Sequence, residues 1–147
     1  MILPPLFLYG TLRDVDILTA VLGRSVAAGH LVAASAPDCA AVYFPHQVYP
    51  ALVQRPGCSA PGLLLMDATQ GDLAALDAFE GDEYRRGPLQ VTTTAGPVAA
   101  EVYWPMVAVA PSAADWTLEG WIREHKPHVL ARETKLGRAA RLGAARR

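Results

Sequence analysis

The sequence predicts an α+β domain built on a mixed sheet or a small barrel. Short apolar or alternating runs, which are typical of strands, outnumber the segments with helical periodicity. Strands and helices also lack the regular alternation that a parallel α/β sheet requires. With 147 residues, of which 52% are hydrophobic and 18% charged, the chain is long enough to bury one sizeable core.

The N-terminal region predicts a strand, a turn and a helix. The apolar run Leu6–Leu8 is expected to be a buried strand that ends at Tyr9-Gly10-Thr11. A helix is expected from Asp14 to Leu22, with Gly23 as its C-terminal stop. The amides of residues 10–13 should then face outward together, where they could hold a carboxylate, a carbonyl oxygen or a developing oxyanion. Taken alone, such a junction is more often an ordinary turn.

The middle of the chain predicts short strands separated by proline-rich loops. A strand with a glycine bulge is expected over residues 26–32. Another is expected over residues 49–53, with a turn at 55–57 that ends it. Residues 62–67 form an uninterrupted apolar run, which predicts a central strand buried on both faces. Thr69–Asp72 resembles a capping box and opens a second helix.

The C-terminal third predicts a hairpin and a last helix. Residues 89–94 and 98–104 alternate in polarity on either side of Ala95-Gly96-Pro97, which is typical of a β-hairpin. Ser112–Asp115 is expected to cap a helix that buries its tryptophans. These are Trp116 and Trp121.

Composition bounds the class of protein. The formal net charge of −1 gives no electrostatic case for a nucleic acid or an anionic membrane as the main partner. Residues 1–5 lack the basic segment of a secretory signal, and Cys39 and Cys58 fit reduced thiols, so we expect a cytoplasmic protein. We expect one domain over residues 1–133 and a basic, frayed tail over 134–147.

A second stretch that could carry chemistry is residues 76–86. Glu80 falls in the last turn of the second predicted helix, which Gly81 ends. There the helix dipole and burial beside Phe79 both disfavour ionisation, which suits a general base. The residues alone leave open an exposed acid paired with one of the arginines that follow. The neighbouring acids are expected to be solvated: Asp77, Asp82 and Glu83.

Together, these motifs carry a family resemblance. They follow one another in a characteristic order and spacing: Tyr9-Gly10-Thr11-Leu12-Arg13, Tyr49-Pro50-Ala51, and Leu76-Asp77-x-Phe79-Glu80-Gly81 followed by Tyr84-x-Arg86. The set resembles the γ-glutamylcyclotransferase family, especially its AIG2-like and γ-glutamylamine cyclotransferase branch, over most of the chain to about Glu133. The resemblance implies a small mixed β-barrel flanked by helices, with a cavity above the Tyr9–Leu12 loop.

The resemblance also implies a reaction and its residues. In this family the substrate's own α-amino group attacks its γ-carbonyl, forms 5-oxoproline and expels the attached amine or amino acid. Glu80 would be the general acid and base, without a cofactor or a metal. The substrate would contact Tyr9, Gly10, Thr11, Leu12 and Tyr84. The Asn that follows Tyr-Gly-Ser in the mammalian γ-glutamyl-amino-acid enzyme is absent here, so the leaving group stays open.

Other readings remain at this stage. A small-molecule-binding or regulatory module could keep the cavity without turnover. His125 and His128, with Glu124, are too few for a metal site, and Cys58 has no partner for nucleophilic chemistry. A basic tail that binds RNA is the least favoured alternative, because terminal basic segments are usually solvated. We expect a small γ-glutamyl substrate as the partner, no nucleic acid and no membrane, and the oligomeric state stays open.

Overall fold

The computed structural model describes residues 3–127, in which five strands and three helices confirm the predicted α+β class. The elements are β1 (Leu6–Leu8), α1 (Val15–Leu22), β2 (Leu31–Tyr43), β3 (Pro50–Leu65), α2 (Gln70–Glu80), β4 (Tyr84–Thr93), β5 (Gly96–Pro105) and α3 (Leu118–Glu124). Three 3-10 turns lie at Thr11–Arg13, Ala28–His30 and Gly81–Glu83.

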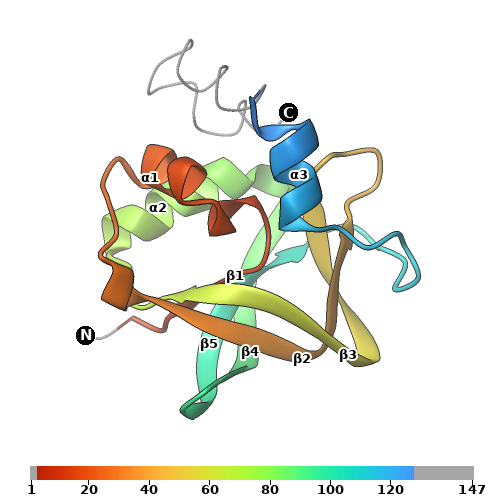
Figure 1. The fold of residues 1–147 in the computed structure, drawn as a ribbon, viewed down its shortest axis with the longest axis horizontal. Coiled ribbons are helices and arrows are strands. Elements are labelled where there is room, and N and C mark those ends of the chain that lie inside the picture. Colours follow the sequence, from red (N-terminus) through yellow and green to blue (C-terminus); the bar gives the residue numbers. More distant parts are fainter. Residues whose placement is uncertain (1–2, 128–147) are drawn as a thin grey trace.

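The strands form one mixed sheet that closes on itself in the order β1-β3-β2-β4-β5. β1 runs antiparallel to β3 and parallel to β5, where Leu6 lies opposite Glu101. The closure is narrow, because β2 and β4 pair at Ser35 and Thr92 alone. Figure 1 shows the long paired strands β2 and β3 below the helices. The expected α+β fold with a small mixed sheet is confirmed. The sheet closes on itself but is not a strict barrel, because its seams between β1 and β5 and between β2 and β4 are short.

Helices α1 and α2 lie side by side over one end of the barrel (Figure 1). The Asp14 side chain caps α1 by accepting hydrogen bonds from the amides of Asp16 (3.1 Å) and Ile17 (3.2 Å). Gly23 ends α1 in the left-handed region with φ 72°. Thr69 and Asp72 form the predicted capping box of α2. Both helices therefore begin and end close to where the local sequence signals place them.

The strand expected over residues 26–32 is wrong in its bounds. A 3-10 turn occupies Ala28–His30, and β2 begins at Leu31 and continues to Tyr43. Pro37, a residue that locally disfavours a strand, sits at a bulge, where the register with β3 shifts between Pro37 and Cys39. The long pairing with β3 thus outweighs the local breaker, because a bulge accommodates one unpaired residue.

The two strands expected over 49–53 and 62–67 are one continuous strand, β3. The expected turn at Arg55-Pro56-Gly57 lies within it, where Gly57 takes φ 86° and donates its N–H to the Asp38 carboxylate at 3.0 Å. The predicted hairpin is confirmed as β4 and β5. A side chain at Gly62, where β3 pairs with β1, would collide with the Leu8 carbonyl, so only glycine fits there.

The last helix is shorter than predicted. Thr117, rather than Ser112–Asp115, caps α3 by accepting from the Gly120 amide at 3.1 Å. The residues before it add to the edge of β2, and Trp116 donates its amide to the Ala41 carbonyl at 3.0 Å. Both tryptophans are buried as expected. Edge pairing with β2 therefore takes up residues that the sequence pattern assigned to the helix cap.

The predicted tail over 134–147 and His128 lie outside the described residues. Within residues 3–127, no helix is long and apolar enough to cross a membrane. In that same range, no group of three or more His, Cys, Asp or Glu side chains is placed to hold a metal ion. Cys39 and Cys58 are both free thiols.

Candidate active site

The turn that follows β1 lines a pocket with Gly10, Thr11 and Leu12. The amide of Arg13 donates to the Gly10 carbonyl at 3.0 Å, and that of Asp14 donates to the Thr11 carbonyl at 3.0 Å. The sequence predicts that the four amides of residues 10–13 face outward together. This prediction is wrong for Arg13, whose N–H forms the hydrogen bond that closes the turn. The preceding amides, those of Gly10, Thr11 and Leu12, have no partner inside the turn, as at any helix start.

Gly10 is required for space rather than for backbone conformation. Its φ is −117°, which other residues adopt readily. A Cβ atom there would lie 2.8 Å from Cγ of Pro50, closer than carbon atoms pack. The carbonyl of Pro50 accepts a hydrogen bond from the Tyr84 hydroxyl at 2.6 Å. The Tyr49-Pro50-Ala51 motif thus acts as the wall against which the turn rests.

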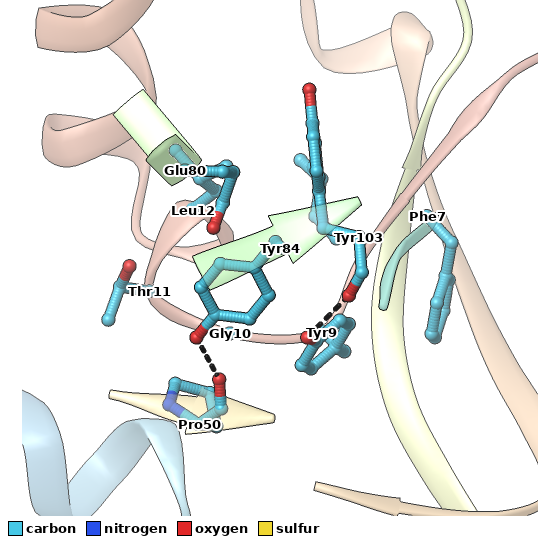
Figure 2. Close-up of a pocket in the computed structure, with 10 residues that line it drawn as sticks. Phe7, Tyr9, Gly10, Thr11, Leu12, Pro50, Glu80, Tyr84 and Tyr103 are labelled. Atoms are coloured by element: carbon cyan, nitrogen blue, oxygen red, sulfur yellow. Dashed lines mark hydrogen bonds between the residues drawn. The ribbon is translucent and has the colours of Figure 1, made fainter. Parts of the chain in front are cut away.

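Glu80 ends α2 and is buried, with 8% of its surface exposed. Leu76 and Phe79 anchor this last turn in the core, and Gly81 reverses the chain with φ 69°. Figure 2 shows the Glu80 side chain directed from the helix end toward the turn at Leu12. The alternative of an exposed helix-end acid is therefore wrong.

One pocket brings together every residue that the sequence assigns to the site. Its empty volume is about 320 Å3. The lining includes the six predicted residues, namely Tyr9, Gly10, Thr11, Leu12, Glu80 and Tyr84. It also includes four residues that received no role from the sequence, namely Phe7, Leu8, Pro50 and Tyr103. A buried acid and the glycine turn thus line one small hollow (Figure 2).

Tyr103 on β5 ties the pocket wall to α2. Its carbonyl accepts from the Tyr9 hydroxyl at 2.8 Å, and its own hydroxyl donates to Oδ1 of Asp77 at 2.6 Å. Arg86 pairs with Asp77 at 3.1 Å and with Glu101 at 2.8 Å. Asp77 is exposed, as expected of a solvated charge, and its carboxylate also fastens α2 to β4 and β5. Arg86 therefore ties α2 to β5 through two ion pairs.

Burial raises the pKa of the Tyr103 phenol, and the hydrogen bond to Asp77 and the nearby charge of Glu80 raise it further. Burial alone would raise the pKa of Asp77, but hydrogen bonds from Arg86 and Tyr103 more than offset this and lower it. Tyr103 therefore stays a neutral hydrogen-bond donor and Asp77 an anion near neutral pH. Neither group exchanges protons near neutral pH. Glu80 is the carboxylic acid among the residues that line the pocket.

A second hydrogen bond holds the other side of the pocket. The Tyr49 hydroxyl lies 2.6 and 2.7 Å from the two carboxylate oxygens of Glu83, to which it donates. The rings of Phe44, Tyr49 and Tyr84 form an aromatic cluster, with centroids 5.5 to 6.4 Å apart. Glu83, expected to be solvated, instead links the turn after α2 to β3. These contacts fix the position of Tyr84 beside the pocket.

The fold and the pocket define a class of protein, namely a small mixed-barrel domain with one acid-walled cavity beside a glycine turn. A family model described as gamma-glutamyl cyclotransferase, AIG2-like, matches residues 6–122. The chain belongs to this family.

Known proteins agree with this assignment. The chain is 29% identical over 123 residues to AIG2-like protein A of Arabidopsis thaliana, covering 82% of this chain and 73% of the relative. It superposes on the solution structure of another Arabidopsis thaliana protein with a TM-score of 0.67 at 27% identity, covering 92% and 91% of the two chains. A structure named gamma-glutamyl cyclotransferase matches with a TM-score of 0.53 at 15% identity, over 70% and 66%, and shares the fold.

Proposed function

We propose that this protein is a γ-glutamyl cyclotransferase that releases 5-oxoproline from a γ-glutamyl-amine or a γ-glutamyl-amino acid. The observation that carries the proposal is the meeting of buried Glu80 with the Gly10–Leu12 turn in one pocket. Family membership supports it.

Glu80 moves the proton in this mechanism. Its carboxylate takes one proton from the substrate's α-ammonium group, and the freed amine attacks the γ-carbonyl carbon. A new C–N bond closes the five-membered ring while the carbonyl oxygen gains negative charge. Glu80 then gives its proton to the leaving nitrogen as the old C–N bond breaks. The attacking nitrogen loses a second proton, which ends on the expelled amine as ammonium, so the reaction neither gains nor loses protons.

In this mechanism the turn provides electrostatic stabilisation of the substrate and of the transition state. The amides of Gly10, Thr11 and Leu12 can hold the substrate's carboxylate or stabilise the developing oxyanion. No protein nucleophile is needed, because the amine and the carbonyl belong to one molecule. The enzyme folds the glutamyl chain so that these two atoms meet. This proximity effect can lower the activation free energy by up to about 7 to 11 kcal/mol.

The first experiment measures 5-oxoproline release from a panel of γ-glutamyl-amines and γ-glutamyl-amino acids. We expect turnover by the wild type and, for Glu80→Gln, a fall in kcat of roughly 100-fold or more, the usual share of a general acid and base. The melting temperature should stay nearly unchanged, because glutamine has almost the same shape.

Two outcomes would contradict the mechanism. Full activity in Glu80→Gln would remove Glu80 from the chemistry. Binding of panel compounds to the wild type without any 5-oxoproline over a long incubation would favour a small-molecule-binding module that keeps the cavity but has no turnover.

A further inference from the structure

A second and larger hollow borders the same turn. Thr11 and Leu12 line the Glu80 pocket, whereas Arg13, the last residue of the turn, lines a groove between the β2–β3 pair and the start of α3. The empty volume of this groove is about 870 Å3, against about 320 Å3 for the Glu80 pocket. None of the residues assigned above to the proposed reaction lines the groove.

Arg13 is half-buried in this groove and makes no side-chain hydrogen bond or ion pair with any residue in the range 3–127. Burial lowers the pKa of its guanidinium, and nearby Glu119 opposes that shift. The other arginine of the groove is different, since Arg55 pairs with Asp115 at 2.7 Å and donates to the Pro111 carbonyl at 2.8 Å. Arg13 thus loses water without gaining a protein partner in the described chain, which is unfavourable for a charge.

Glu119 supplies an anion to the same groove. It lies on the first turn of α3, is exposed, and forms no ion pair with another described residue. Its charge acts on Arg13, yet the two side chains do not form a salt bridge. The groove therefore presents a cation and an anion that are near each other and are not joined.

The rest of the lining is largely apolar. Ala40 and Ala60 come from the paired strands β2 and β3, and Trp116 and Leu118 from the segment that leads into α3. Ala40, Ala60 and Trp116 are buried, and Leu118 is half-buried. Such a surface favours a ligand that has an apolar body as well as polar ends.

We propose that this groove binds a small zwitterion of the α-amino acid class, with its carboxylate on Arg13, its ammonium on Glu119 and an apolar side chain over the alanines. Guanidinium forms a two-pronged, charge-assisted pair with a carboxylate. A ligand with a negative charge alone would be repelled by Glu119, and one with a positive charge alone by Arg13. A zwitterion satisfies both, and its binding does not depend on the proposed reaction.

The experiment uses three ligands that differ in one charge each: leucine, N-acetyl-leucine, which lacks the ammonium, and leucinamide, which lacks the carboxylate. Binding is followed by NMR at the indole N–H of Trp116, which donates to the Val48 carbonyl at 2.9 Å at the edge of the groove. We expect leucine to shift this signal and to bind several-fold more tightly than either analogue. The indole of Trp104, on β5 and outside the groove lining, should not move.

Variants of Arg13 and Glu119 test which charged group of the ligand each side chain contacts. Arg13→Gln should weaken leucine and N-acetyl-leucine by about tenfold, because one charged hydrogen-bonded pair is lost. It should not weaken leucinamide, because the charge that repels this cation is removed. Arg13→Lys should have affinities between those of the wild type and Arg13→Gln, because lysine keeps the positive charge but cannot form the two-pronged pair. Glu119→Gln should weaken leucine and leucinamide by a smaller factor, about threefold, because the site is exposed.

Arg123→Gln is the matched control, because its side chain is 71% exposed on α3 and outside the groove lining. It should bind all three ligands as the wild type does. Equal affinity for the three ligands would overturn the proposal. So would lower melting temperatures in Arg13→Gln and Glu119→Gln with unchanged leucine affinity, because these two side chains would then pair with each other in solution. Circular dichroism checks that each variant is folded.

Discussion

The two ends of helix α2 each carry a buried acid, and the two acids differ in their surroundings. Asp72 near the N-terminal end is 5% exposed, and Glu80 at the C-terminal end is 8% exposed. Asp72 accepts from the Thr69 amide at 3.0 Å and from Arg24 at 2.7 Å, and it is not part of the pocket lining. Glu80 lines the pocket. The two acids are therefore similarly buried, but they differ in what they face, because Glu80 borders a pocket and Asp72 does not.

The surroundings of each acid follow from its place on the helix. At the N-terminus, unpaired amides and the positive end of the dipole stabilise a carboxylate, so Asp72 strengthens the helix start. At the C-terminus both effects are reversed, and an acid there is a poor choice for stability. We infer that Glu80 occupies this unfavourable position because the proposed reaction uses it, and that Asp72 serves the fold.

After Glu80→Gln, the largest loss of activity is expected from a change in the turn opposite Glu80. In Gly10→Ala the new methyl group would lie 2.8 Å from Pro50, so the turn must shift. We expect kcat/KM for 5-oxoproline release to fall roughly 10- to 100-fold, because small displacements of catalytic groups are costly. Gly29→Ala is the control, since a Cβ there meets nothing within 4 Å. Equal activity in both variants would mean that the turn does not hold the substrate.

A smaller effect, on stability rather than activity, is expected at the other end of α2. In Asp72→Asn the charged pair with Arg24 is lost, although Arg24 keeps its contact with Asp67 at 3.3 Å. We expect the free energy of unfolding to fall by about 1 to 3 kcal/mol, which calorimetry would record as a melting temperature several degrees lower. The rate of 5-oxoproline release at 25 °C should not change. A loss of activity would break the distinction between the two acids.

The smallest effect is a pH dependence of stability. Burial alone would raise the pKa of Asp72, but hydrogen bonds from Arg24 and the Thr69 amide more than offset this and lower it. A carboxylate whose folded pKa is lowered stabilises the fold above its unfolded pKa of about 3.9. This contribution is lost as the pH falls through the folded pKa.

Melting temperatures measured at a series of pH values should therefore be nearly constant above about pH 5 and decline below about pH 4. Asp72→Asn should show a shallower decline than the wild type. An identical decline in both proteins would show that Asp72 does not contribute to acid sensitivity.

Local signals in the sequence were enough for the helices and the hairpin. The Thr69 capping box and the stop at Gly23 act within a few residues, so they hold whatever packs around them. The long strands were not predictable in this way. Pro37 and Gly57 are strand breakers locally, yet the paired strands β2 and β3 accommodate one at a bulge and the other at a positive φ.

Six of the residues that line the pocket could be predicted from short motifs, and the fold brings in the others. Tyr9–Leu12, Glu80 and Tyr84 lie in short motifs, so the sequence could name them. Tyr103 lies in the alternating run of β5 and received no role from the sequence, whereas the structure brings it to the pocket wall. Pro50 was part of a motif, but its role as the wall behind Gly10 depends on the close contact that the fold creates.

The most direct test is a structure of the protein with 5-oxoproline bound. We predict that the Glu80 carboxylate accepts a hydrogen bond from the lactam N–H, while the amides of Gly10 to Leu12 hold an oxygen of the same ligand. A bound 5-oxoproline that contacts only one of these two groups, or that binds outside this pocket, would contradict the central claim that Glu80 and the turn act on one substrate.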